Sequence, residues 1–171
     1  RPDIIYIFSK DILRHRRAQK EDAVWLKKGE EYKDETLSVR AFGSTDVGVS
    51  FLLQASGKKI FHAGDLNNWH WMDESTEAQW KGAEKNFLHE LDDLYAYTPE
   101  VDVAMFPVDP RLGKEYMRGA GQFVTKIKTH IFVPMHFTPE YAKANAFRDF
   151  AEAHGVRFVS LTHRGQKIEI E

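Results

Sequence analysis

The segment that most constrains the fold is residues 59–71, which read KIFHAGDLNNWHW. Its apolar first part predicts a buried strand that ends at Gly64 and Asp65, before a polar loop. In α/β proteins the ends of strands expose side chains at the rim of the sheet, whereas strand centres are covered by packing. We therefore expect Asp65 to project into a crevice, with Gly64 allowing the backbone to approach a neighbour closely. The alternative is that Gly-Asp forms an ordinary turn.

The length and composition limit the class of protein. With 171 residues the chain can form one domain with a substantial core, and we predict a single domain over residues 1–171. It contains no Cys, which excludes disulfides and thiolate metal sites and is typical of a cytoplasmic protein. A net charge of −2 argues against a nucleic-acid partner, and the basic run at residues 14–17 is interpreted as a solvated face. No apolar segment approaches the roughly 20 residues needed to span a bilayer, so no membrane partner is expected.

The start of the chain is unusual for a complete domain. It begins at Arg1 without Met and almost at once enters an apolar run at residues 4–8. Because a domain rarely opens inside a core element, we expect that residues preceding Arg1 belong to the same polypeptide. A trimmed, disordered leader is the alternative.

Hydrophobic periodicity predicts an α/β fold, with mixed β-sheet layers covered by helices. The predicted strands are residues 4–8, 23–26, 37–42, 49–54, 59–63, 101–106, 130–135, 156–161 and 166–170. The predicted helices are residues 9–19, 73–97, 116–128 and 140–154. Residues 30–35 are expected to form a polar turn, and Thr138 is expected to cap the last helix with Pro139 at its first position.

Three segments resemble the metallo-β-lactamase fold family of metal-dependent hydrolases, in particular its lactonase-like branch. They are the hairpin of residues 48–65 that ends in Gly-Asp, the strand of residues 101–107 after the long helix, and the segment 129–137, which contains Pro-x-His. Together they extend the resemblance over roughly residues 36–137. It implies an αββα sandwich whose N-terminal part is missing from this sequence.

The same resemblance implies a metal site. In the family the Asp of Gly-Asp bridges two metal ions, and the His after the late strand completes the second site. By position these roles fall to Asp65 and His136, although from the residues alone His136 is more often a structural histidine. Carboxylate and imidazole are suitable ligands for Zn, Mn or Fe. The family's further His before the hairpin is replaced by Asp46 or its neighbours, and an oxygen donor there favours a harder metal such as Mn²⁺. A turn or cap at Asp46 is equally consistent with the sequence.

The strongest signature of the family is absent. His-x-His-x-Asp-His does not occur, because no two of the eight His residues stand two positions apart. By resemblance, those ligands would precede Arg1. We therefore expect this chain alone to bind metal weakly and to have little activity.

Polar and aromatic residues around the predicted rim are candidates for substrate binding. Asn68, Trp69 and His70 are predicted to line a substrate mouth, because aromatic and amide groups bind organic molecules. The alternative is that the Trp residues only attach the loop to the long helix. Asp109 and Arg111, after another strand end, are further candidates for substrate contacts.

The resemblance implies a metal-dependent hydrolase acting on a small-molecule substrate. A metal-bound hydroxide, oriented by Asp65, would attack an ester, lactone, amide or phosphoester. The implied cofactor is a divalent transition metal, Zn, Mn or Fe, bound as a pair or absent from this chain. The alternative is a non-catalytic or fragmentary α/β binding module with a degenerate metal site. A homo-oligomer is a further expectation, because half a sandwich leaves an apolar face to be covered.

Overall fold

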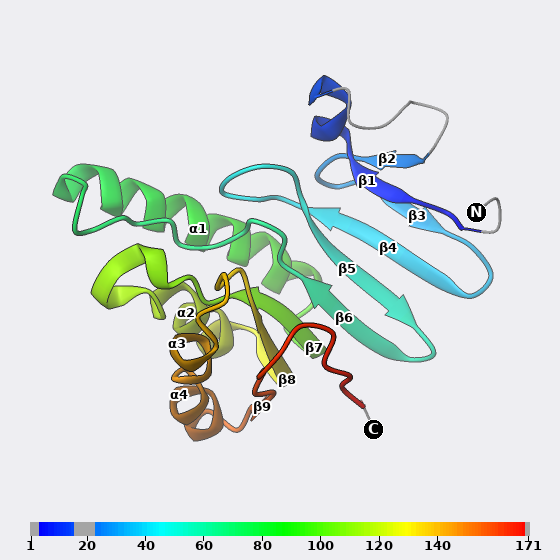
Figure 1. The fold of residues 1–171 in the computed structure, drawn as a ribbon. Helices are drawn as coiled ribbons and strands as arrows, with labels where there is room; N and C mark the ends of the chain where they lie inside the picture. Colours follow the sequence, from blue (N-terminus) through cyan, green and yellow to red (C-terminus); the bar gives the residue numbers. More distant parts are fainter. Residues whose placement is uncertain (1–3, 16–22, 170–171) are drawn as a thin grey trace.

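A mixed sheet of seven strands forms the centre of the fold, in the order β3-β4-β5-β6-β7-β8-β9 (Figure 1). The computed structural model describes residues 4–15 and 23–169. The strands of this sheet are β3 (Glu31–Lys33), β4 (Leu37–Phe42), β5 (Ser50–Ala55), β6 (Lys58–His62), β7 (Glu100–Pro107), β8 (Lys128–Met135) and β9 (Arg157–Phe158). Strands β3 to β6 pair antiparallel, whereas β6 to β9 pair parallel. Because β6, β7 and β8 run parallel, they all end at one edge of the sheet. Parallel neighbours also need crossover connections.

Helices supply these crossovers. They are α1 (Glu77–Tyr97) between β6 and β7, η3 (Pro110–Glu115) and α2 (Arg118–Lys126) between β7 and β8, and α3 (Tyr141–Asn145) and α4 (Arg148–Ala153) between β8 and β9. Of these, η3 is a 3₁₀ helix, and another 3₁₀ helix, η1 (Lys10–His15), lies near the start of the described residues. Thr76 begins α1 with a capping box, in which its side chain accepts from the backbone of Gln79 and the Gln79 side chain accepts from the backbone of Thr76. Within the described residues, no helix is both long and apolar enough to cross a membrane.

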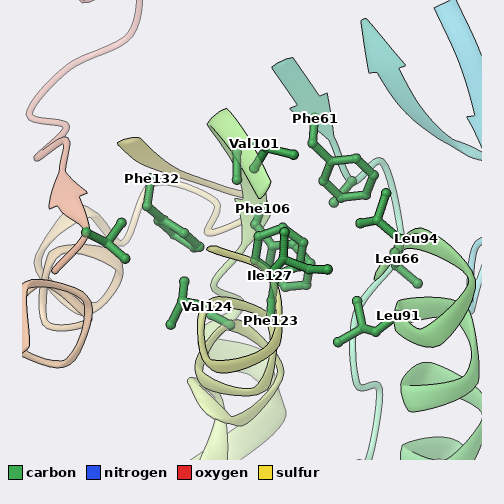
Figure 2. Packing of buried hydrophobic residues seen from close by; sticks show 14 of the residues in the cluster. Phe61, Leu66, Leu91, Leu94, Val101, Phe106, Phe123, Val124, Ile127 and Phe132 are labelled. Carbon is green, nitrogen blue, oxygen red and sulfur yellow. The ribbon is translucent and has the colours of Figure 1, made fainter. Parts of the chain in front are cut away.

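The main core lies between the helices and one face of the sheet. Six Phe side chains are fully buried there: Phe61, Phe87, Phe106, Phe123, Phe132 and Phe147. The ring of Phe106 is central, with its centroid 4.5 Å from that of Phe123 and 6.2 Å from that of Phe87. Figure 2 shows Phe61 and Phe106 reaching from the strands toward Phe123 of α2 and Leu91 of α1. This aromatic layer holds α1 and α2 against the strands that carry the site.

The opposite face of the sheet is covered by two smaller elements. Strands β1 (Ile7–Ser9) and β2 (Val24–Leu26) form a parallel pair, and Leu26 packs there with Val39 and Ala41 of β4. At the other end, the chain after β9 returns across the sheet, where Val159 packs with residues of β7 and β8. The described part of the chain therefore contains one large sheet and one two-stranded sheet.

The structure confirms the predicted mixed sheet with helices, and it corrects several elements. Residues 31–33 form strand β3 instead of a turn, because they pair with β4 along their length. The predicted helix 140–154 is divided into α3 and α4, because Phe147 turns into the core against Phe132. Thr138 does not cap it, since its φ is 25° and the helix begins at Tyr141. Residues 166–169 form no strand. Residues 16–19 of the first predicted helix, which include half of the basic run, and residue 170 lie outside the described residues.

The central position of Phe106 predicts a large loss of stability on truncation. Phe106→Ala should lower the free energy of unfolding by about 3–5 kcal/mol, because it leaves a cavity among packed rings. The matched control is Phe150→Ala, at a residue that is 42% exposed, with an expected loss of about 1–2 kcal/mol. Urea unfolding followed by circular dichroism measures both values, and equal losses would contradict the assignment of the core.

Candidate functional site

Three loops meet at the edge where the parallel strands end. Asp65 follows β6, Asp109 follows β7 and His136 follows β8. Because β6, β7 and β8 are hydrogen-bonded neighbours, these residues come close together although 71 positions separate the first from the last. The predicted convergence of Asp65 and His136 is therefore present in the structure.

The glycine of the Gly-Asp pair is required by the backbone. Gly64 has a φ of 57°, and a Cβ at this position would lie 2.8 Å from the carbonyl oxygen of Val49. Any side chain would meet both a strained conformation and a backbone clash. The close approach expected from the sequence thus occurs, and it directs the chain so that Asp65 faces the β8 loop.

His136 lies between two carboxylates. Its Nε2 is 3.4 Å from Oδ1 of Asp65, and its Nδ1 is 2.8 Å from Oδ2 of Asp109. The backbone of His136 is left-handed, with a φ of 64°. Non-glycine residues in this region are uncommon and concentrate at functional sites, where the surroundings hold them in place.

Asp109 forms the buried end of this arrangement. Its side chain is only 1% exposed, and it accepts hydrogen bonds from Nε, Nη2 and the backbone N–H of Arg111. Burial is the largest influence on the carboxyl group and opposes ionisation. The hydrogen bonds from Arg111 and His136 together outweigh it, so the pKa of Asp109 lies below its ordinary value. Asp109 is therefore ionised near neutral pH.

A cavity of about 330 Å³ opens beside His136. Its lining residues are Thr45, Asp46, Trp69, Trp71, Arg111 and His136. The rings of Trp69 and Trp71 stack with centroids 6.4 Å apart, and Trp69 lies 5.3 Å from the imidazole of His136. The cavity thus combines an aromatic wall with charged groups, which is the usual make-up of a small-molecule site.

Hydrogen bonds between side chains and the backbone hold the loop that carries the aromatic wall. The indole Nε1 of Trp69 donates to the carbonyl oxygen of Asp65 at 2.8 Å. The hydroxyl of Thr45 donates to the carbonyl oxygen of Asn67 at 2.6 Å and accepts from its N–H at 3.0 Å. The loop is therefore tied to the segment before β5, which contains Asp46.

Two of the predicted substrate contacts lie behind the cavity wall. Asn68 is fully buried, and its amide donates to Gln122 and Glu84. His70 is 1% exposed, with Nε2 near the carbonyl oxygen of Glu115 and Nδ1 accepting from Met72. Neither side chain lines the cavity, because both attach the loop to the elements behind it: Asn68 to α1 and α2, and His70 to η3. Of the three predicted residues, Trp69 alone faces the space where a substrate would lie.

The donor set partly fits a metal ion. Two donors about 2.1 Å from a tetrahedral ion lie about 3.4 Å apart, and the Asp65 Oδ1 to His136 Nε2 distance is 3.4 Å. Asp46 lines the same cavity and is exposed. Among the described residues, however, no group of three or more His, Asp or Glu side chains is placed to hold one ion. The structure provides a pair of donors with a nearby carboxylate.

Comparison with known proteins gives matches only at the level of structure. No family model matches the sequence, and no curated protein matches it. A candidate metal-dependent hydrolase from Parabacteroides distasonis is 15% identical, with a TM-score of 0.63 over 93% of this chain and 64% of that chain. Igni18, a metallo hydrolase from Ignicoccus hospitalis, is 17% identical, with a TM-score of 0.55 over 92% and 65%. YhfI, a metallo-β-lactamase fold protein from Bacillus subtilis, is 9% identical, with a TM-score of 0.52 over 91% and 63%.

The chain has a metallo-β-lactamase-like fold. It spans less than two thirds of the length of each of these three proteins. Identities of this size establish the fold and leave the chemistry to be argued from the residues. The predicted fold family is confirmed, whereas the lactonase-like branch and the roles of Asp65, His136 and Asp46 stay predictions.

Within this metallo-β-lactamase-like fold, Asp109 pairs with His136, a contact that was not predicted from the sequence. Asp109 was expected to touch substrate, but it is buried and bonded to Arg111 and His136, while Arg111 lines the cavity. The feature of the sequence that could have indicated the buried Asp109 is the position of Arg111 two residues after it, directly beyond a strand end. The Glu84 side chain accepts hydrogen bonds from Arg118 and Gln122 behind the loop. No pattern in the sequence indicates these contacts.

The site loop packs so closely on α2 that a methyl group there should be destabilising. A Cβ at Gly119 would overlap Oδ1 of Asn67 and lie 3.0 Å from the N of Asn68. Gly119→Ala should therefore lower the free energy of unfolding by about 1–3 kcal/mol. The control is Gly82→Ala in α1, where the added methyl would meet nothing within 4 Å, and a gain of about 0.5–1 kcal/mol is expected. Chemical denaturation measures both changes, and a gain at Gly119 would contradict the close packing.

Proposed function

We propose that this protein is a metal-dependent hydrolase that acts on a small organic molecule in the cavity beside His136. The observation that carries the proposal is the 3.4 Å separation of Asp65 Oδ1 from Nε2 of His136, the histidine that lines that cavity. The names of two structural neighbours, a candidate metal-dependent hydrolase and a metallo hydrolase, support the same class.

Asp65 and His136 would hold a divalent transition metal such as Zn, Mn or Fe. When bound, such an ion supplies a Lewis acid that polarises the scissile bond and lowers the pKa of water to about 7. Asp46 is the nearest additional donor, and its carboxylate would add a hard oxygen ligand. The remaining donors of a complete site are not among the described residues.

The residues around the donor pair suggest how substrate is held. Trp69 and Trp71 give a flat apolar wall on which an acyl or aromatic group can pack. Arg111 lines the same cavity with a side chain that is 58% exposed, so it can contact a polar group of the substrate. An ester, lactone, amide or phosphoester small enough for about 330 Å³ fits these features.

The alternative is a non-catalytic binding module that uses the Trp loop. It is favoured by the fact that only two donors meet in the described part of the chain. In that case Nε2 of His136 bonds directly to Asp65, and the cavity binds an organic ligand without metal. Metal titration separates the two functions.

The proposal predicts that Asp65 and His136 are needed for metal binding. Asp65→Ala and His136→Ala should each weaken Zn²⁺ or Mn²⁺ binding to the metal-free protein at least about 10-fold, because each removes one of two converging ligands. Isothermal titration calorimetry measures the affinity, and hydrolysis of model esters, lactones, amides and phosphoesters with added metal measures activity. Asp92→Ala, which removes an exposed carboxylate of α1, serves as the matched control. Equal affinity in the wild type and in Asp65→Ala would refute the proposed metal site.

A second prediction concerns Asp46 and the choice of metal. Asp46→His places a nitrogen donor where the carboxylate lines the cavity, so Zn²⁺ affinity should rise relative to Mn²⁺ affinity, because imidazole suits zinc better than manganese. Competitive titration of the two ions against the wild type and Asp46→His measures the ratio. Asp46→Ala is the control, and it should weaken both ions. An unchanged ratio in Asp46→His, with both ions unaffected by Asp46→Ala, would show that Asp46 is not a ligand.

A further inference from the structure

Asp109 lies against His136 but does not line the cavity. Its side chain is 1% exposed and approaches the side of the imidazole that faces away from Asp65. We infer that Asp109 is a positioning residue: it accepts a hydrogen bond from Nδ1 of His136 and fixes the neutral ring with the Nε2 lone pair directed at Asp65. The inference rests on the proposed function in one respect, namely that His136 is the residue whose orientation matters.

The hydrogen bonds around Asp109 indicate which nitrogen of the His136 ring carries the proton. The guanidinium and the backbone N–H of Arg111 all donate to Asp109. Nδ1 of His136 has two polar neighbours, Oδ2 of Asp109 at 2.8 Å and Nη2 of Arg111 at 3.4 Å. An ionised carboxylate only accepts hydrogen bonds, so the shorter contact makes Nδ1 the donor, and the guanidinium bonds to Asp109 instead. A neutral imidazole has one N–H. With that proton on Nδ1, Nε2 is left as an acceptor.

The orientation of the ring is fixed from several sides. The backbone of His136 is left-handed, the ring of Trp69 packs beside the imidazole at 5.3 Å, and Asp109 holds Nδ1. Together these contacts direct Nε2 toward Oδ1 of Asp65. Two acceptors that face each other repel, and a cation placed between them satisfies both lone pairs. A carboxylate behind a ligating histidine also raises the basicity of the ligand.

Arg111 has a different task, which makes the inference testable. Its guanidinium compensates the charge of the buried carboxylate, but it is not the acceptor for Nδ1. Removing Asp109 eliminates both the ion pair and the acceptor for Nδ1, whereas removing Arg111 eliminates the ion pair and the longer contact of its Nη2 with Nδ1 but leaves the acceptor in place. A purely structural role for the pair predicts the same behaviour in both variants.

The experiment reads the tautomer of His136 by ¹⁵N NMR in the metal-free protein, at a pH where the imidazole is neutral. The wild type should show Nδ1–H and an unprotonated Nε2. Asp109→Ala should convert a large part of the population to Nε2–H, while Arg111→Ala keeps Nδ1–H. In the same variants, Zn²⁺ affinity should fall about 10- to 100-fold for Asp109→Ala and less for Arg111→Ala.

The outcomes separate this inference from the proposed function. Nε2–H in the wild type overturns the inference, and this measurement needs no variant, so it holds even if Asp109→Ala fails to fold. An equal change of tautomer in Arg111→Ala also overturns it, because the ion pair and not the acceptor would then set the ring. The NMR readout requires no metal, so a wild type with Nδ1–H that binds no Zn²⁺ refutes the metal site alone.

Discussion

The parallel pairing of β6, β7 and β8 is the constraint on which the site depends. In this register Phe61 lies beside Ala104, and Ala104 lies beside Phe132, so the three strands end at the same edge and deliver Asp65, Asp109 and His136 to one place. A shift of one residue would turn the buried side chains of a strand to the other face. The aromatic layer under α1 and α2 therefore protects the site as well as the core, because it makes such a shift costly.

The loops beyond the strand ends contain residues in unfavourable backbone conformations that help to form the site. Gly64, Trp71 and His136 all have positive φ, and two of them carry large side chains for which this region is unfavourable. The cost is offset locally, since the Trp69 indole, Thr45 and Asp109 each bond to the loops concerned. Strain of this kind, gathered around one cavity, is more typical of a functional site than of a connection between strands.

Much of the fold could be predicted from the sequence, because strand ends and buried faces leave local patterns. The Gly-Asp pair, the hairpin before it and the late strand before His136 were all predicted from such patterns. The burial of Asn68 and His70 was not, since it depends on where α2 and η3 pack against the loop, which no local pattern specifies. The orientation of Asp109 was missed for a similar reason: its spacing to Arg111 was visible, but its contact with His136 exists only after β7 and β8 pair.

The balance of charge in the cavity ties these features to function. Arg111 is bonded to the buried Asp109, Asp46 and His136 line the cavity, and Asp65 lies 3.4 Å from Nε2 of His136. If Nε2 carries no proton, its lone pair and the carboxylate of Asp65 face each other, and a cation between them would stabilise both. If Nε2 carries a proton, it donates directly to Asp65 and no donor pair is left for a cation. The protonation state of one nitrogen, Nε2 of His136, therefore separates a metal centre from a plain binding cavity.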